Sequence, residues 1–331
     1  MAKKLYDTLI KPLGMKKQKI PPDKTYSEAN SGPATSNGIW IDGRKGLEGL
    51  NCSFAWEYHD GTGEWDTSRA SHMHGYPEIQ LFVGLDTAAI NYLGADIEYC
   101  LGDAMEAHTF SEPTAVILPA GVRHGPVTTK RMYSPRGFGC CTIALTPGHK
   151  KYLPEKPASL MRKGTTWSHL IKPVKDSIVI ERRKQIKTRT DDTRPDTGSQ
   201  LEAISKIMLG PGNADHLVWM DGNDLEELGV SVGWGFFSRP GVWHRGAGAH
   251  IHPADEILVF LGTSPDRGDI LGAEIEIELG KEHELHLITE PCAVIIPAGL
   301  PHGPFITRWV DRAFAFFSVD LVGQPEITFI D

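Results

Sequence analysis

An internal repeat constrains this chain more than any other feature of its sequence. When the sequence is shifted by 178 positions, residues 72–126 align with residues 250–304 without a gap, and 26 of the 55 aligned positions are identical. Only two copies occur, and their period is far longer than the roughly 20–50 residues of solenoid and propeller repeats. We therefore expect two domains of similar fold.

Within each copy, apolar and polar side chains alternate as they do along β-strands. Residues 50–58 and 228–236 both show this pattern, and residues 93–99 have one acidic and one apolar face. The 35 glycines and 23 prolines supply many turns. The sequence thus predicts an all-β fold, with an antiparallel sandwich or barrel in each half. One short helix is expected over 199–209.

These patterns divide the chain into four segments. We expect an N-terminal arm over 1–40, a first barrel over 41–148, a basic linker or arm over 149–212 and a second barrel over 213–331. The two arms share a motif, because Leu9 to Pro12 recurs as Leu170 to Pro173. The duplicated unit therefore includes an arm as well as a barrel.

Charge is distributed unevenly between arms and barrels. Residues 1–24 carry a net charge of +5 (seven Lys, two Asp), and residues 150–194 carry +8 (thirteen Lys and Arg, five Asp and Glu). Since the whole chain is at −8, the remainder is at −8 − 13 = −21. We expect the arms to lie on the acidic barrels of this subunit or of a neighbour, rather than on nucleic acid. A homodimer or higher homo-oligomer follows from this reading.

Composition also bears on the compartment. No apolar run approaches the roughly 18 residues of a membrane span, and the N-terminus lacks the apolar segment of a secretory signal. The five cysteines are an odd number and include no C-x-x-C motif. Reduced thiols in a cytoplasmic protein without a membrane partner are therefore expected.

One pattern carries chemistry, and it occurs in both copies: His-x-His-x3-Glu followed 46 positions later by His. The first two histidines and the glutamate have the same parity, so a strand directs them to one side, and a Pro-Ala-Gly turn returns the last histidine to the same place. Three imidazoles and one carboxylate suit Fe(II), Mn(II), Ni(II), Zn(II) or Cu(II). We expect two divalent transition metals per chain, held by His72, His74, Glu78 and His124 and by His250, His252, Glu256 and His302.

These two motifs resemble the signature motifs of the cupin superfamily, and their duplication is similar to that of the bicupins. The resemblance covers about 45–145 and 223–322 and implies a double-stranded β-helical jelly roll in each half. Two departures are visible: Asp66 stands where cupins usually have Gly, and both copies end in His-Gly-Pro without the usual Asn. We find no close match to the oxalate decarboxylase, gentisate dioxygenase or quercetin dioxygenase branches.

The parity of the ligands also predicts which neighbours face each cavity. In the first barrel these are Tyr76, Gln80, Phe82 and Thr128, and in the second Ala254, Leu258, Phe260 and Ile306. The first pocket therefore offers polar groups to a small polar substrate, whereas the second is almost apolar. We take Gln80, Tyr76 and Thr128 as the candidate catalytic residues.

Four further residues are conspicuous because they recur in both copies. His108 and His286 lie in charged strands, where an outward, interface-forming role competes with catalysis. Trp65 and Trp243 precede the metal motifs, where they either pack in the core or line the mouth of the barrel. The sequence leaves both choices open.

Three classes of function fit this pattern. The first is a metal-dependent dioxygenase or oxidative decarboxylase acting on a small oxygen-bearing organic acid or carbonyl compound. The second is a metal-dependent isomerase or lyase, which requires a general base besides the metal ligands. The third is a non-catalytic small-molecule binder. We favour the first, with catalysis in the first barrel.

Overall fold

The computed structural model describes residues 4–14, 16–17, 37–65, 71–148, 151–152, 163–174, 214–243 and 248–330. Strands dominate these residues, and the helices among them are short 3-10 segments: Asp7–Leu9 (η1), Ser168–Leu170 (η2) and Pro265–Arg267 (η3). The expected all-β class is confirmed. The helix expected over 199–209 lies outside the described residues.

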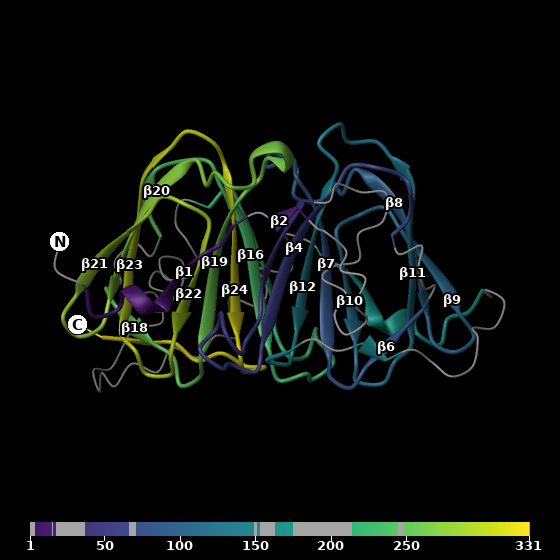
Figure 1. Ribbon diagram of the computed structural model, residues 1–331, viewed down its shortest axis with the longest axis horizontal. Helices are drawn as coiled ribbons and strands as arrows, with labels where there is room; N and C mark the ends of the chain where they lie inside the picture. Colours follow the sequence, from purple (N-terminus) through teal and green to yellow (C-terminus); the bar gives the residue numbers. More distant parts are fainter. Residues whose placement is uncertain are drawn as a thin grey trace, which may run out of the picture. The chain divides into compact units, whose positions relative to one another are not determined.

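The chain forms two compact units. The first, here called the N-terminal barrel, comprises Gly14–Val174 and Ser264–Asp266. The second, the C-terminal barrel, comprises Met1–Leu13, Lys175–Thr263 and Arg267–Asp331. Each unit contains one copy of the repeat (Figure 1).

The N-terminal barrel is built on a seven-stranded sheet in the order β14-β10-β7-β12-β4-β3-β2 and a four-stranded sheet in the order β5-β11-β8-β9. Most neighbours are far apart in the chain, as jelly-roll crossovers require. A short pair, β13-β6, lies beside them. The strands are β2 (Lys16–Lys17), β3 (Asn37–Ile41), β4 (Ser53–His59), β5 (Gly63–Glu64), β6 (Met73–His74), β7 (Glu78–Gly84), β8 (Ala95–Leu101), β9 (Glu106–Phe110), β10 (Thr114–Leu118), β11 (His124–Met132), β12 (Phe138–Ala144), β13 (Lys151–Tyr152) and β14 (Ile171–Pro173).

The C-terminal barrel repeats this plan. Its sheets have the orders β1-β22-β19-β24-β16-β15 and β21-β20-β23-β18-β25, and β17 also pairs with β23. The strands are β1 (Ile10–Pro12), β15 (His216–Met220), β16 (Ser231–Phe237), β17 (Gly241–Val242), β18 (His250–Ile251), β19 (Glu256–Gly262), β20 (Ala273–Leu279), β21 (Glu284–Ile288), β22 (Cys292–Ile296), β23 (His302–Val310), β24 (Phe314–Asp320) and β25 (Thr328–Phe329).

Alternation places the core inside each barrel. In β20, Ile275 and Ile277 are fully buried, whereas Glu274, Glu276 and Glu278 lie on the outer face. Burying such aliphatic side chains contributes roughly 1.5–3 kcal/mol each. Trp243 belongs to the same core; it is 2% exposed and its indole N–H donates to Thr307 at 2.7 Å. Trp65 is buried in the same way against Thr129, so both tryptophans pack in the core and do not line a mouth.

Each arm completes the barrel formed by the other repeat. β1 pairs with β22, with Ile10 opposite Val294, and so belongs to the C-terminal barrel. β14 pairs with β10, with Ile171 opposite Val116, and belongs to the N-terminal barrel. The expectation that arms lie on barrels is therefore confirmed for their described parts, 4–13 and 163–174.

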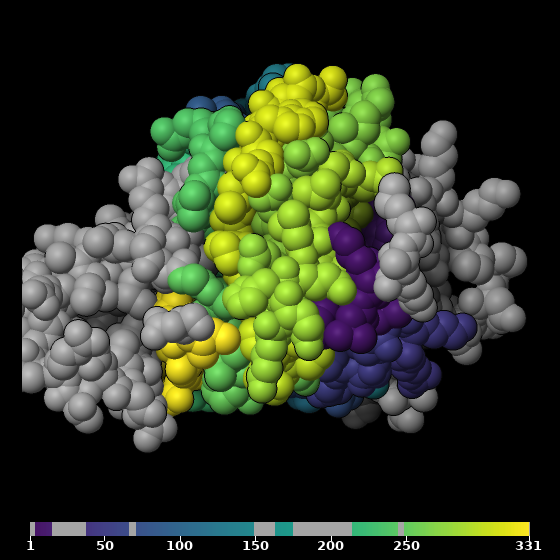
Figure 2. Space-filling model, turned by 90° about the vertical axis from the view of Figure 1, so that its left-hand side faces the viewer, coloured from purple at the N-terminus to yellow at the C-terminus, as the bar shows by residue number. Residues whose placement is uncertain are grey.

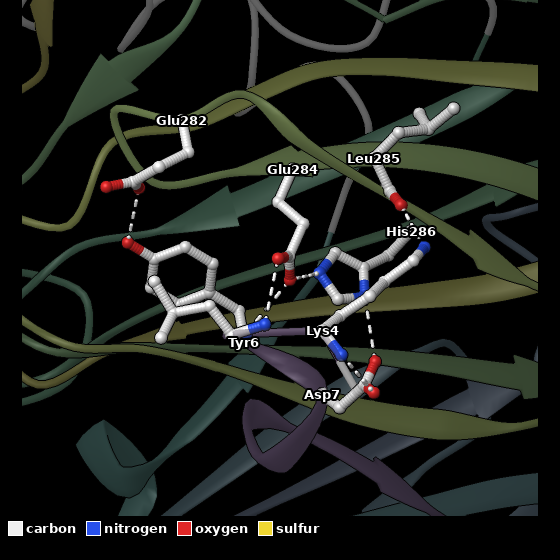
Figure 3. Close-up of polar contacts among 8 residues, drawn as sticks. Lys4, Tyr6, Asp7, Glu282, Glu284, Leu285 and His286 are labelled. Atoms are coloured by element: carbon white, nitrogen blue, oxygen red, sulfur yellow. Dashed lines mark hydrogen bonds and ion pairs between the residues drawn. The ribbon is translucent and has the colours of Figure 1, made fainter. Parts of the chain in front are cut away.

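Two carboxylates of the C-terminal barrel hold the first arm through its neutral backbone N–H and tyrosine hydroxyl groups, so these contacts do not use the positive charge of its lysines. Glu284 accepts hydrogen bonds from the backbone N–H groups of Leu5 (2.8 Å) and Tyr6 (3.0 Å), and the Tyr6 hydroxyl donates to Glu282 at 2.8 Å (Figure 3). Lys4 Nζ donates to the carbonyl of Leu285.

His286 and His108 lie at the contacts with the two arms. His286 is 2.8 Å from Glu284 and 3.6 Å from Asp7 of the arm (Figure 3). In the N-terminal barrel, His108 lies 3.7 Å from Glu106, which accepts a hydrogen bond from the backbone of Trp167 in the second arm. Both histidines therefore contact the chain's own arms, but the predicted outward orientation is wrong, because His286 is 3% and His108 is 9% exposed. The exposed Leu285 and Leu287 occupy the opposite face of β21.

All five cysteines are buried and none is paired in a disulfide. Over the residues that the structure describes, no helix combines the length and the apolar character needed to cross a bilayer.

Candidate metal centres

Three histidines converge in the N-terminal barrel. His72 pairs with His124 as an isolated β-bridge, and each backbone N–H donates to the other's carbonyl at 2.9 Å. His74 lies on β6, so the predicted strand does break at residues 75–77 before β7 begins. One ring nitrogen from each of the three residues lies within 4.8 Å of the others.

A tight turn brings the last histidine back to this point. Gly121 has a φ of 81°, which favours glycine, and its N–H donates to the carbonyl of His74 at 2.7 Å. The Val122 N–H donates to the carbonyl of Pro119 at 3.2 Å, and this hydrogen bond closes the turn. The Pro-Ala-Gly motif thus fixes the start of β11 beside β6.

Glu78 joins the histidines from the first residue of β7. Its Oε2 lies 3.4 Å from His74 Nε2, and all four side chains are 7% exposed or less. Two ligands of a first-row metal, each about 2.0–2.2 Å from it, are separated by no more than about 4.4 Å. The four predicted residues therefore come together at a spacing that fits one such ion.

The C-terminal barrel contains the same arrangement. Glu256 Oε2 lies 3.4 Å from His252 Nε2 and 3.3 Å from His302 Nε2, and the rings of His250 and His302 are 4.1 Å apart. Those two Nε2 atoms and Glu256 Oε2 are buried and make no hydrogen bond among the described residues. Buried polar atoms of this kind cost free energy unless a ligand satisfies them, which suits a metal ion.

Electrostatics keeps this carboxylate ready to ligate. Burial by itself raises the pKa of Glu256, but the adjacent His252 and His302, together with a hydrogen bond from Ser318, lower it to about 2. The group is therefore an anion at neutral pH, as a metal ligand must be.

The remaining ring nitrogens are held by the protein. His124 Nδ1 lies 3.0 Å from the carbonyl of Val122, and His302 Nδ1 lies 3.0 Å from that of Leu300. A carbonyl can only accept, so Nδ1 carries the proton and the lone pair is on Nε2, facing the centre. His252 Nδ1 is held similarly, 3.1 Å from the carbonyl of Glu326.

Comparison with known proteins rests on structure alone. No protein-family model matches the sequence, and no curated protein matches it either. Solved structures of Bacillus subtilis oxalate decarboxylase do match. The structure at pH 4.6 aligns with a TM-score of 0.51 and 9% identity over 94% of this chain and 77% of that one. A mutant of the same enzyme gives a TM-score of 0.52 and 9% identity over 94% and 78%.

The chain has the bicupin fold.

A further oxalate decarboxylase structure, from a study of its Mn(II) centres, aligns with a TM-score of 0.50 and 9% identity over 93% of this chain and 78% of that one. Identity this low is consistent with the absence of a close match in the sequence motifs. The likeness in fold covers 93% of this chain and therefore both barrels.

The side-chain amide of Gln80 is hydrogen-bonded within the protein and is not directed at a substrate. It is 1% exposed, its amide nitrogen donates to Glu78 Oε1 at 2.7 Å, and its amide oxygen accepts from the Tyr99 hydroxyl at 2.9 Å. Both ends of the amide are therefore used inside the protein. Gln80 orients a metal ligand, and Tyr99, which the motif analysis did not single out, orients Gln80.

Tyr76 also acts on a ligand. Its hydroxyl lies 3.1 Å from His74 Nδ1, and the two rings stack with centroids 4.9 Å apart. Ala254 is the counterpart of Tyr76 in the C-terminal barrel, where a backbone carbonyl holds the equivalent histidine.

The prediction that Thr128 faces the cavity is wrong. The register of β11 shifts between His124 and Val127, which reverses the parity of the residues that follow. Thr128 is opposite Glu98 on the outer face, whereas Thr129 is 2% exposed and bonded to Trp65. The same shift places Ile306 on the outer face of the C-terminal barrel.

The C-terminal centre is not as apolar as predicted. Ser318 donates to Glu256 Oε1 at 2.8 Å, and Asp320 lies 3.4 Å from the same hydroxyl and 3.3 Å from that of Ser231. Burial and the charge of Glu256 raise the pKa of Asp320 well above its usual value. These residues lie on β24 and β16, which the motif analysis did not place near the metal; only strand pairing reveals them.

Two further buried polar residues were not predicted from the sequence. Glu57 and His59 lie 3.7 Å apart on β4, buried at 7% and 1% exposure. Burial raises the pKa of the Cys140 thiol, and the charges of Glu57 and Glu78 raise it further. The Cys140 thiol therefore lies close enough to both Glu57 and Glu78 for their charges to raise its pKa. The sequence contains one indication of Glu57: the odd-numbered residues before it along this strand are small, and Glu57 is the first charged one.

Proposed function

We propose that this bicupin is a metal-dependent enzyme of the oxidative decarboxylase or dioxygenase type, acting on a small organic acid in its N-terminal barrel. The observation that carries the proposal is the buried centre of His72, His74, His124 and Glu78, with Glu78 held by Gln80. The likeness to structures of oxalate decarboxylase, an enzyme whose Mn(II) centres have been studied, supports the same class.

A divalent ion at this centre would supply a Lewis acid for a substrate carboxylate and, with manganese or iron, one-electron chemistry. The protein residues do the rest. Val122 and Tyr76 fix the rings of His124 and His74 through Nδ1. Burial of all four ligands limits access of water, which strengthens each electrostatic interaction there.

A second candidate is a metal-dependent isomerase or lyase. This class needs a general base besides the metal ligands, and Glu57 is a buried carboxylate on the same side of the barrel as Glu78. The C-terminal barrel has Gly235 at the equivalent position, and a buried carboxylate besides Glu256, that of Asp320, lies on β24. A non-catalytic small-molecule binder remains the third alternative.

Reconstitution separates these classes. The purified protein would be loaded with Mn(II), Fe(II) or Zn(II), its metal content measured, and each form incubated with oxalate and other short mono- and dicarboxylic acids, with and without oxygen. CO2 release or oxygen consumption with Mn or Fe only would support the proposal. Solvent-deuterium incorporation with Zn and without oxygen, lost in Glu57→Gln, would instead identify the second class. Binding without turnover for every metal would leave a binding protein.

The assembly and compartment that we propose follow from the surface and the thiols. Five buried, unpaired cysteines suit a reducing cytoplasm. We expect a homo-oligomer, with no nucleic acid or membrane partner.

A further inference from the structure

The outer face of the C-terminal barrel carries exposed apolar side chains on both sides of the acidic strand β20. Four exposed large hydrophobic side chains lie on β17, β21 and β23: Val242 (41%), Leu285 (42%), Leu287 (54%) and Trp309 (47%). Figure 2 shows this side of the molecule, with the N-terminal arm in purple against it. Leu5 of that arm is 65% exposed, and its N–H is bonded to Glu284, the neighbour of Leu285.

Strand register joins two of these side chains, Leu287 and Val242, into one row across the sheet. Glu276 is opposite Leu287 on β21 and opposite Ile306 on β23, and Ile306 is opposite Val242 on β17. Directly opposed residues share a face of a sheet. The row across the four strands therefore reads Leu287, Glu276, Ile306, Val242.

The internal repeat supplies a matched comparison. In the N-terminal barrel the equivalent row reads Thr109, Glu98, Thr128, Glu64, with the same pairings. Three of its four positions are therefore polar in one barrel and aliphatic in the other. Outside the row, Ala107 and Arg131 are likewise replaced by Leu285 and Trp309. These five replacements make the C-terminal face more apolar, whereas Glu278 in place of Cys100 adds a charge to β20.

The charges on this face have not changed in the same way. Glu276 pairs with Arg308 at 2.5 Å, and Glu98 pairs with Lys130, the equivalent residue, at 2.7 Å. The C-terminal face has thus kept an acid–base pair at its centre and gained apolar side chains on both sides of it. Exposed apolar side chains gathered on one face mark a protein interaction site, and the charge pair between them offers both signs of charge to a partner.

We propose that this face binds the same face of a second copy of the chain, giving a two-fold dimer. A two-fold axis running along the strands between β20 and β23 places β20 of one subunit over β23 of the other. Leu287 then lies over Val242 of the partner subunit and Glu276 lies over Ile306 of the partner subunit, so that the two Glu276–Arg308 pairs lie side by side with their charges reversed. A purely basic partner would fit less well, because Arg308 already compensates Glu276 within the chain.

Disulfide trapping tests the register directly. Within one chain, the positions of Leu287 and Val242 are three strand spacings apart, about 14 Å, too far for a disulfide. All five native cysteines are buried and cannot compete. Mixing the Leu287→Cys and Val242→Cys variants under mild oxidation should give a covalent dimer that contains one chain of each, whereas neither variant alone should be trapped efficiently.

Sedimentation tests the energetics. The triple variant Val242→Glu, Ile306→Thr, Leu287→Thr installs the row of the N-terminal barrel, which that fold already accommodates. The dimer dissociation constant should rise by about 100-fold or more, with metal content and melting temperature retained. Thr109→Ser in the N-terminal row is the matched control and should leave the dimer unchanged. A monomeric wild-type protein at micromolar concentration, a triple variant that remains dimeric, or a mixture that fails to cross-link would overturn the proposal. None of these results depends on activity.

Discussion

The side-chain amide of Gln80 donates a hydrogen bond to Glu78 Oε1 at 2.7 Å, whereas Leu258 at the equivalent position of the other barrel can donate nothing to Glu256. There, the hydroxyl of Ser318 supplies the donor, from a different strand. The two centres therefore share a ligand set but orient their carboxylates by different means. Such outer contacts tune metal affinity and activity.

Replacing Gln80 with Leu tests this relationship. Glu78 would lose its donor while all four ligands remain, so we expect the metal to stay bound and kcat to fall about 10–100-fold with little change in KM. Steady-state kinetics and the electron paramagnetic resonance spectrum of the Mn(II) form measure both effects. Leu258→Gln, the reverse change in the other barrel, should leave turnover intact. Full activity and an unaltered spectrum in Gln80→Leu would show that this hydrogen bond is irrelevant.

Removal of one histidine from each centre tests metal stoichiometry and the site of catalysis. His124→Ala and His302→Ala should each reduce the metal content from two ions per chain to one, because each removes a buried ligand. Activity should disappear only in His124→Ala. Elemental analysis beside an activity assay decides the matter, and loss of activity in His302→Ala alone would assign catalysis to the C-terminal barrel.

His59 offers a test of stability. Its ring stacks on Trp65 at 3.7 Å, yet both ring nitrogens are buried and make no hydrogen bond among the described residues. Phe237 occupies the same position in the C-terminal barrel and stacks on Trp243 at 4.2 Å. His59→Phe should therefore raise the free energy of unfolding by about 1–3 kcal/mol, the cost of an unsatisfied buried polar group. Chemical denaturation measures it, and Phe237→His should have the opposite effect. A destabilised His59→Phe variant would mean that the contact of the imidazole with Glu57, at 3.7 Å, outweighs its missing hydrogen bonds.

Acid should release the first arm. Burial opposes ionisation of Glu284, but hydrogen bonds from the backbone of Tyr6 and Leu5 and from His286 lower its pKa below the usual 4.5. A carboxyl with a lowered pKa stabilises the folded state fully above its unfolded value, and that contribution is lost as the pH falls through the lowered value. Protection of the Leu5 and Tyr6 amides against hydrogen exchange should thus be constant near neutrality and weaken below about pH 4.5. Glu284→Gln should weaken it already at neutral pH; protection that persists in this variant would contradict the role assigned to Glu284.

Local patterns in the sequence were sufficient for the fold class and the ligands. Alternation with period two predicted strands, and the shared parity of His72, His74 and Glu78 predicted their convergence, because strand geometry over a few residues depends only on those residues. Each of these two patterns occurs in both copies of the repeat, so each prediction rests on two separate segments. The acidic outer face around Glu276 was predicted on the same basis.

What surrounds the ligands was decided by the tertiary structure. Tyr99 reaches Gln80 from another strand, and Ser318 reaches Glu256 across 62 positions of sequence. Thr128 was misplaced because a shift of one residue in β11 reverses the face of the residues from Val127 to Thr129, before a second shift follows. β1 and β14 each pair with the barrel of the other repeat. Pairing between distant strands is set by long-range hydrogen bonds and side-chain packing, which leave no periodic mark on the sequence of either strand alone.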